Sequence, residues 1–139
     1  MNGKFMFAVF SSVFIALALA GCQSEKKMLM DDVSDIKEIS LSKSTHFGKL
    51  NGEFFATFED SHELDTLKKA LITAEKEKVK LEDVNYDLLI TDDEDGNYLL
   101  QCYLGEEGEK SAFFYIGHEE KVYFTSEEVT QELRKVMKL

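Results

Sequence analysis

The two cysteines of this 139-residue chain are its most reactive side chains, and their surroundings predict different chemistry. Cys22 follows Leu19–Gly21 (Leu-Ala-Gly), so small residues stand directly before the thiol. These residues end an uncharged run that begins after Lys4. A basic start, an apolar stretch and small residues at its end are typical of a bacterial secretion signal. The pattern predicts a lipobox, in which the Cys22 thiol takes a diacylglycerol and becomes the new N-terminus.

An uncleaved transmembrane anchor is the alternative for this segment. Such a helix usually needs about 20 apolar residues, and the run between Lys4 and Cys22 is shorter. The lipoprotein interpretation divides the chain into a signal peptide (residues 1–21), the lipidated Cys22 with a polar tether (residues 22–33), and one domain (residues 34–139). It places the protein on the outer face of a bacterial cell membrane, held there by lipid.

The second cysteine, Cys102, has no partner for an intramolecular disulfide once Cys22 carries lipid. Strand alternation places Cys102 on one face with Leu100 and Leu104. Burial among apolar side chains raises the pKa of a thiol and suppresses its reactivity. We therefore predict an inert core residue. The alternative is a nucleophile that the fold brings next to a histidine.

The three histidines, His46, His62 and His118, lie far apart in the sequence. No pair has the spacing that places two imidazoles on one helical face, and Cys102 has no cysteine partner, so a zinc site is not predicted. Each histidine stands beside an expected turn or helix start. The sequence predicts no catalytic residue and no cofactor.

An acidic turn, Asp92–Asn97, has the composition of a calcium loop. Aligning Gly96 with the glycine of an EF-hand places Thr91 and Cys102 at positions that need carboxylates. The motif fails, and the segment is predicted to be a solvated hairpin turn. Weak cation binding by its carboxylates is the alternative.

The charge of the chain restricts its partners. Removing residues 1–21, which hold one lysine and no acidic residue, changes the formal net charge from −11 to −12. Phosphates would be repelled, so nucleic-acid binding is excluded as a function class. Anionic lipid headgroups would repel the chain as well, so the acyl chains must supply the membrane attachment. The remaining length suffices for one domain.

Hydrophobic periodicity predicts the elements. Period-two patterns over residues 39–41, 54–58, 86–90 and 98–104, with the apolar runs 112–116 and 122–125, predict strands. One helix is expected after Asp60, with Glu63 as its capping-box partner; the other starts at Thr125, with Glu128 as partner. The order β-β-α-β-β-β-β-α predicts an α+β fold with a mostly antiparallel sheet and two helices.

Several short blocks resemble a known family. They resemble small YhfM-like lipoproteins of Bacillus and its relatives, over a span from about Val33 to the end, in the blocks Phe47–Asn51, Leu67–Ala70, Tyr86–Leu88 and Gly105–Ser111. The resemblance implies a Gram-positive envelope lipoprotein with a small α+β domain. It implies no catalytic or binding residues.

Strict alternation places apolar side chains on both faces of the expected sheet. The face turned to the helices takes Phe54, Phe58, Leu88, Ile90, Leu100, Cys102 and Phe124. The opposite face takes Phe55, Leu89, Leu99, Tyr103 and Tyr123, with Phe113 or Phe114. An exposed apolar patch of this kind marks a contact site. The alternative is that curled strands, a crossing helix or the tether cover it.

Aromatic side chains are suitable anchors for a protein partner. The residues predicted to bind one are Phe55, Tyr103, Phe114 and Tyr123. The leading hypothesis is therefore a lipid-anchored, non-catalytic module that holds an envelope protein. The alternative is a lipoprotein that presents a small molecule or cation at the membrane, and an enzyme is a distant third.

Overall fold

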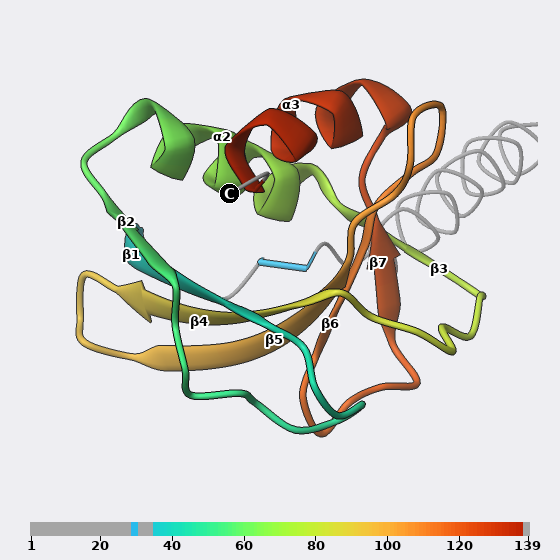
Figure 1. The fold of residues 1–139 in the computed structure, drawn as a ribbon, viewed down its shortest axis with the longest axis horizontal. Helices are drawn as coiled ribbons and strands as arrows, with labels where there is room; N and C mark the ends of the chain where they lie inside the picture. Colours follow the sequence, from blue (N-terminus) through green and yellow to red (C-terminus); the bar gives the residue numbers. More distant parts are fainter. Residues whose placement is uncertain (1–28, 31–34, 138–139) are drawn as a thin grey trace, which may run out of the picture.

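A computed structural model describes residues 29–30 and 35–137 of the chain (Figure 1). Its elements, in chain order, are β1 (Ile36–Lys43), β2 (Ala56–Glu59), α2 (His62–Thr73), β3 (Glu75–Glu77), β4 (Tyr86–Asp92), β5 (Asn97–Tyr103), β6 (Ala112–Tyr115), β7 (Val122–Phe124) and α3 (Glu127–Met137). The predicted α+β class and the order of the predicted elements are confirmed. The structure adds β3, which is too short to show a periodic pattern.

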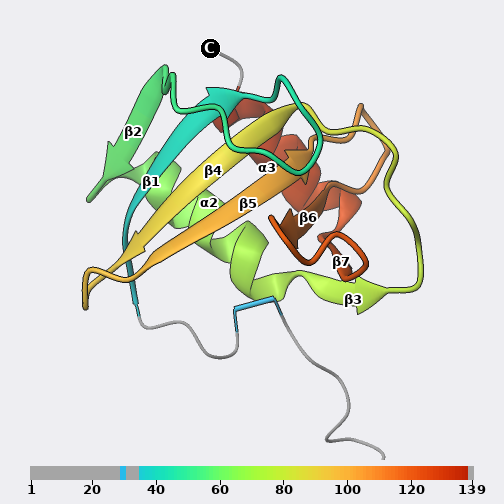
Figure 2. The ribbon, with the colours of Figure 1, turned by 90° about the horizontal axis from the view of Figure 1, so that it is seen from below.

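The strands form one antiparallel sheet in the order β2-β1-β4-β5-β6-β7-β3. Strands β2 and β3 are therefore its opposite edges. Helices α2 and α3 lie together on one face of the sheet, called here the inner face (Figure 1). The loop that joins β1 to β2, residues 44–55, passes across the other face, called here the outer face (Figures 1 and 2).

Both helices begin one residue later than the sequence indicated. Ser61 is the N-cap of α2, and its hydroxyl accepts a hydrogen bond from the Leu64 N–H at 3.2 Å. Ser126 does the same for the Val129 N–H at 3.1 Å. Asp60 instead has a φ of 39° and turns the chain into α2. A serine three residues before the N–H that it caps meets the same physical need as the predicted capping boxes.

The core lies between the helices and the inner face. The predicted apolar stripe of α2 is confirmed: Leu64, Leu67, Leu71 and the adjoining Ala74 are all buried. Facing it, the register aligns Leu41, Leu88 and Leu100 across three neighbouring strands. The antiparallel register thus gathers apolar side chains from distant segments under one helical layer.

Leu29 and Met30 also belong to this core, and their exposed fractions are 4% and 8%. The sequence predicts that residues 22–33 form a tether, but Leu29 and Met30 within this range are buried in the core. Their burial has a simple cause, because both side chains are large and apolar in an otherwise polar segment. The expected signal peptide and lipidated Cys22 lie outside the described residues. No helix in the described part is long and apolar enough to cross a membrane.

Candidate functional site

The outer face of the sheet is covered in part by the loop of residues 44–55, called here the covering loop (Figure 2). Phe47 of this loop stacks on Phe114 of β6, with ring centroids 5.2 Å apart. Phe114 is completely buried, while Phe47 is 48% exposed. The prediction that Phe114 is available to a partner is thereby corrected, because a loop rather than the tether or a helix lies over it.

Gln101 on β5 fixes the covering loop. Its carbonyl oxygen accepts a hydrogen bond from the Gly48 N–H at 2.7 Å. Its amide nitrogen lies 2.9 Å from the His46 carbonyl and 2.9 Å from an Asp87 carboxylate oxygen. Gln101 has no exposed surface, and its bond to Asp87 is buried, while those to the loop are partly buried. A buried amide that is satisfied in this way holds both strand and loop in one arrangement.

Asp87 on β4 extends the same network. Its second carboxylate oxygen accepts a hydrogen bond from the Asn51 N–H at 2.7 Å. The buried Ser42 hydroxyl donates to the Asn51 carbonyl, also at 2.7 Å. This part of the outer face thus binds the protein's own loop through polar groups.

Tyr123 lies on the inner face, contrary to the prediction. It pairs with Phe113 on β6, which pairs in turn with the core residue Cys102 on β5. Tyr123 is 7% exposed and belongs to the core cluster. Phe124, which was expected to face the helices, pairs with Ala112 and Glu75 on the other face. A three-residue strand shows no alternation of its own, so only its neighbours fix which side chains point inward.

The other two predicted binding residues are accessible but separate. Phe55 is 41% exposed, and its ring meets the edge of Tyr86 at a centroid distance of 6.2 Å. Tyr103 is half-buried, and its hydroxyl donates to Glu109 at 3.3 Å. Burial, followed by the negative charge of Glu109, raises the pKa of the Tyr103 phenol. Phe55, Tyr103, Phe114 and Tyr123 therefore do not form one surface.

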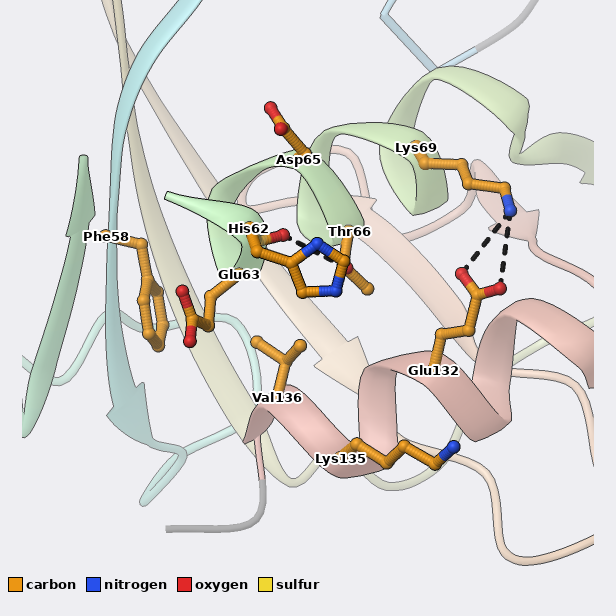
Figure 3. A pocket seen from close by; sticks show the side chains of 9 residues that line it. All are labelled: Phe58, His62, Glu63, Asp65, Thr66, Lys69, Glu132, Lys135 and Val136. Atoms are coloured by element: carbon orange, nitrogen blue, oxygen red, sulfur yellow. Dashed lines mark hydrogen bonds and ion pairs between the residues drawn. The ribbon is translucent and has the colours of Figure 1, made fainter. Parts of the chain in front are cut away.

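A groove of about 710 Å³ lies where α2 and α3 pass each other beside β2 (Figure 3). We call it the α2–α3 groove, and its lining residues are Phe58, His62, Glu63, Asp65, Thr66, Lys69, Glu132, Lys135 and Val136. Phe58 and Val136 supply apolar surface. Lysines and carboxylates from both helices supply the rim.

An ion pair joins the two helices at one end of the groove. There the Lys69 ammonium bridges to both carboxylate oxygens of Glu132, each at 3.4 Å (Figure 3). The His62 ring projects between the helices above Val136, and Glu63 points toward Phe58 (Figure 3). The groove can therefore offer apolar contact, an imidazole and charges of both signs along a path that opens to solvent.

The remaining candidates for chemistry lie elsewhere. Cys102 is completely buried, as predicted, and burial raises the pKa of its thiol. His46 bonds to its neighbour Thr45, and His118 lies 3.8 Å from Glu120 on a separate turn. Within residues 29–30 and 35–137, no three or more His, Cys, Asp or Glu side chains are placed to hold a metal ion.

The acidic turn is a hairpin between β4 and β5. Asp95 has a φ of 62°, which the predicted tight turn requires. Asp92 is buried, and its carboxylate accepts hydrogen bonds from the Gly96 N–H at 2.7 Å, the Glu94 N–H at 3.0 Å and the Tyr98 hydroxyl at 3.0 Å. These bonds shape the turn itself.

Sequence reasoning missed the α2–α3 groove as a site. Phe58 was expected on the inner face, and the register opposite Ile39 confirms this, but β2 is an edge strand that the helices only partly cover. The opposite charges of Lys69 and Glu132 were visible in the sequence. Which charges meet depends on how two distant helices align, and no local pattern contains that information.

No protein-family model matches the chain, and no curated protein is significantly similar to it. Its structure resembles the crystal structure of a thioesterase-like protein from Clostridium sporogenes ATCC 15579, with a TM-score of 0.58. The match covers 75% of this chain and 95% of that one, at 19% sequence identity. A likeness at this identity shows a shared fold.

Proposed function

We propose that this protein is a lipid-anchored, non-catalytic binding domain on the outer face of a bacterial cell membrane. Its α2–α3 groove holds a segment of an envelope protein. The observation that carries the proposal is the composition of this groove, in which an apolar strip of Phe58 and Val136 runs between lysines and carboxylates. Apolar anchors with a charged rim are the usual features of a groove that takes an amphipathic peptide segment.

The anchoring part of the proposal is supported by the lipobox-like residues that end at Cys22. Two acyl chains on this thiol would hold the domain stably at a bilayer, which a single chain would not. The net charge of −12 after removal of residues 1–21 agrees with an anchor that works by burial of hydrocarbon rather than by charge.

Site-specific photocrosslinking in cells tests the groove. A photoreactive amino acid replaces Glu63 on the rim of the groove or, as a matched control, Thr73 at the exposed C-terminal end of the same helix. We expect a discrete crosslinked protein from position 63 alone. Adding Phe58→Lys should abolish the crosslink, because it places a charge on the partly buried apolar surface of the groove. Equal capture from both positions, or capture that survives Phe58→Lys, would contradict the proposal.

Thioester hydrolysis is the second candidate function. The shared fold with a thioesterase-like protein favours it, and the groove holds an imidazole beside a carboxylate, His62 and Glu63. Such a reaction needs a base that takes a proton from the attacking water. A panel of acyl thioesters should be hydrolysed no faster by the native protein than by the His62→Ala/Glu63→Gln variant. Faster hydrolysis by the native protein would favour the enzyme.

The third possibility is a lipoprotein that presents a small ligand, and thermal melting tests it. A compound that binds only the folded state raises the melting temperature by mass action. We expect no shift with divalent cations or small metabolites. A reproducible shift that His62→Ala removes would move the function of the groove from protein binding to ligand binding.

A further inference from the structure

The chain enters the described domain at one defined point. The Leu29 N–H bonds to the Ala74 carbonyl at 3.5 Å, directly after α2. The Leu29 carbonyl accepts a hydrogen bond from the Tyr115 hydroxyl at 2.7 Å. Met30 is buried beside it, with its sulfur 3.4 Å from the same hydroxyl. Residues that precede Leu29 therefore start from the end of the sheet where β3 begins.

The distance from this point to Cys22 is short. Six residues lie between Leu29 and Cys22, so seven Cα–Cα steps join the two residues. Fully extended, these steps span at most about 25 Å. The Leu29 N–H bonds to Ala74, the residue that directly precedes β3, so a bilayer that holds Cys22 is within reach of the β3 edge.

The β3 edge carries an unusual group of basic side chains. Lys76, Lys78 and Lys80 alternate along five residues, all are exposed, and the exposed Val79 lies among them. We call these four residues the lysine corner. In the described part of the chain, none of its three lysines forms an ion pair, whereas the intervening Glu77 is paired with Lys110 at 3.2 Å. The corner thus presents three exposed lysines without ion-pair partners among the described residues, on a chain whose formal net charge is −11.

We propose that the lysine corner contacts the anionic headgroups of the membrane that holds Cys22, and so fixes the orientation of the domain. This inference rests on the proposed lipid anchor. Ammonium groups on flexible stems suit phosphate oxygens, and Val79 among them suits the interface between headgroups and acyl chains. The α2–α3 groove includes Phe58 of the opposite edge strand β2, so this orientation turns the groove away from the bilayer.

The acidic neighbours of the corner limit its role to orientation. Glu119 and Glu120 line the far side of a hollow of about 560 Å³ that Lys76, Lys78 and Lys80 line on the near side. Glu119 accepts a hydrogen bond from the Gly117 N–H, and Glu120 lies beside His118. The anchor supplies the affinity for the bilayer. The lysine corner decides which end of the acidic domain approaches the bilayer.

The test uses the full lipoprotein, purified from membranes in detergent and reconstituted into vesicles that contain a nitroxide-labelled lipid. Because Cys102 is buried and Cys22 carries lipid, one introduced thiol takes a fluorophore selectively. The label is placed at Val79→Cys in the corner, or at Glu59→Cys on the opposite edge. Vesicles of phosphatidylcholine alone are compared with vesicles that also contain phosphatidylglycerol.

We expect strong quenching at position 79 and little at position 59, with the difference larger in phosphatidylglycerol vesicles. Lys78→Glu/Lys80→Glu should remove most of this difference, while the matched pair Lys37→Glu/Lys43→Glu, exposed on β1, should leave it unchanged. Equal quenching at both positions, or no effect of phosphatidylglycerol, would overturn the orientation. Mass spectrometry of the N-terminal peptide separates the two claims, because an unacylated Cys22 would overturn the anchor itself.

Discussion

The inner face of the sheet and the part of the outer face under the covering loop are both shielded from water, but in opposite ways. The inner face lies under α2 and α3 through apolar side chains such as Leu67 and Phe113. The outer face lies under the covering loop, which Gln101 and Asp87 hold through buried hydrogen bonds. The backbone polar groups of a loop need partners where they are covered. Gln101 and Asp87 supply such partners, beside the apolar contact of Phe47 with Phe114.

This difference limits the surfaces of the domain on which a partner can bind. Apolar side chains tolerate any apolar neighbour of the right volume, whereas a buried amide accepts only the donors and acceptors for which it is placed. The covered part of the outer face is thus committed to its own loop. The groove proposed to hold a partner stays open beside β2, because the helices only partly cover that edge strand.

Substitution of two adjacent phenylalanines tests this comparison of the two faces and has the largest expected effect on stability. Phe113 faces the helices and Phe114 faces the covering loop, and both are completely buried. Phe113→Ala should lower the free energy of unfolding by about 4 kcal/mol. Phe114→Ala should cost less, since a single loop can collapse into the cavity more easily than two packed helices can. Chemical denaturation measures both, and equal losses would show that the loop is as rigid as the helical layer.

Removing the amide of Gln101 should loosen the covering loop on the outer face and leave the helical layer on the inner face intact. Gln101→Leu leaves the Gly48 N–H without its acceptor and takes the Gln101 donor from one of the two Asp87 carboxylate oxygens. We expect a loss of about 2 kcal/mol and faster hydrogen exchange at Gly48 and Asn51. Hydrogen exchange of the α2 amides should stay slow, because it should still require global unfolding of the domain. Loop amides that remain protected would show that Phe47 and Phe114, rather than Gln101, hold the loop.

The hydrogen bond between the Tyr115 hydroxyl and the Leu29 carbonyl should contribute less to stability than the Gln101 amide does. Tyr115→Phe removes the hydroxyl that bonds to the Leu29 carbonyl at 2.7 Å but keeps the ring. We expect a loss of about 1 kcal/mol, with cleavage by protease near Leu29 accelerated more than cleavage within the sheet. Unchanged proteolysis near Leu29 would show that burial of Leu29 and Met30 alone secures this segment.

The β4–β5 turn should show the smallest effect at neutral pH and the clearest pH dependence. The Gly96 N–H, with the Tyr98 hydroxyl, holds the pKa of Asp92 below its ordinary value of 3.8. The stability that ionised Asp92 contributes is therefore complete above the ordinary value and lost as the pH falls through the lowered one. Asp92→Asn should lie slightly below the native protein at pH 7 and converge with it in strong acid. A constant gap across the acid range would contradict this assignment.

Particular elements show how far sequence reasoning extends. The α2 stripe, the β4–β5 hairpin and the burial of Cys102 were predicted because each rests on spacing within a few residues. The strand β3 and the inward side of Tyr123 were not, because three-residue strands show no period. The candidate groove was missed for a related reason, since it forms only where α2, α3 and β2 meet.

The sequence by itself determined the α+β class, the order of the predicted elements and the core face of α2. It also supplies the whole basis for the proposed anchor at Cys22, which lies outside the described residues. Only the tertiary structure decided that the covering loop shields Phe114, that Leu29 and Met30 join the core, and that Lys69 meets Glu132. Periodicity fixes which way a side chain points from its own element. What that side chain meets depends on segments far away in the chain, and no local pattern records their placement.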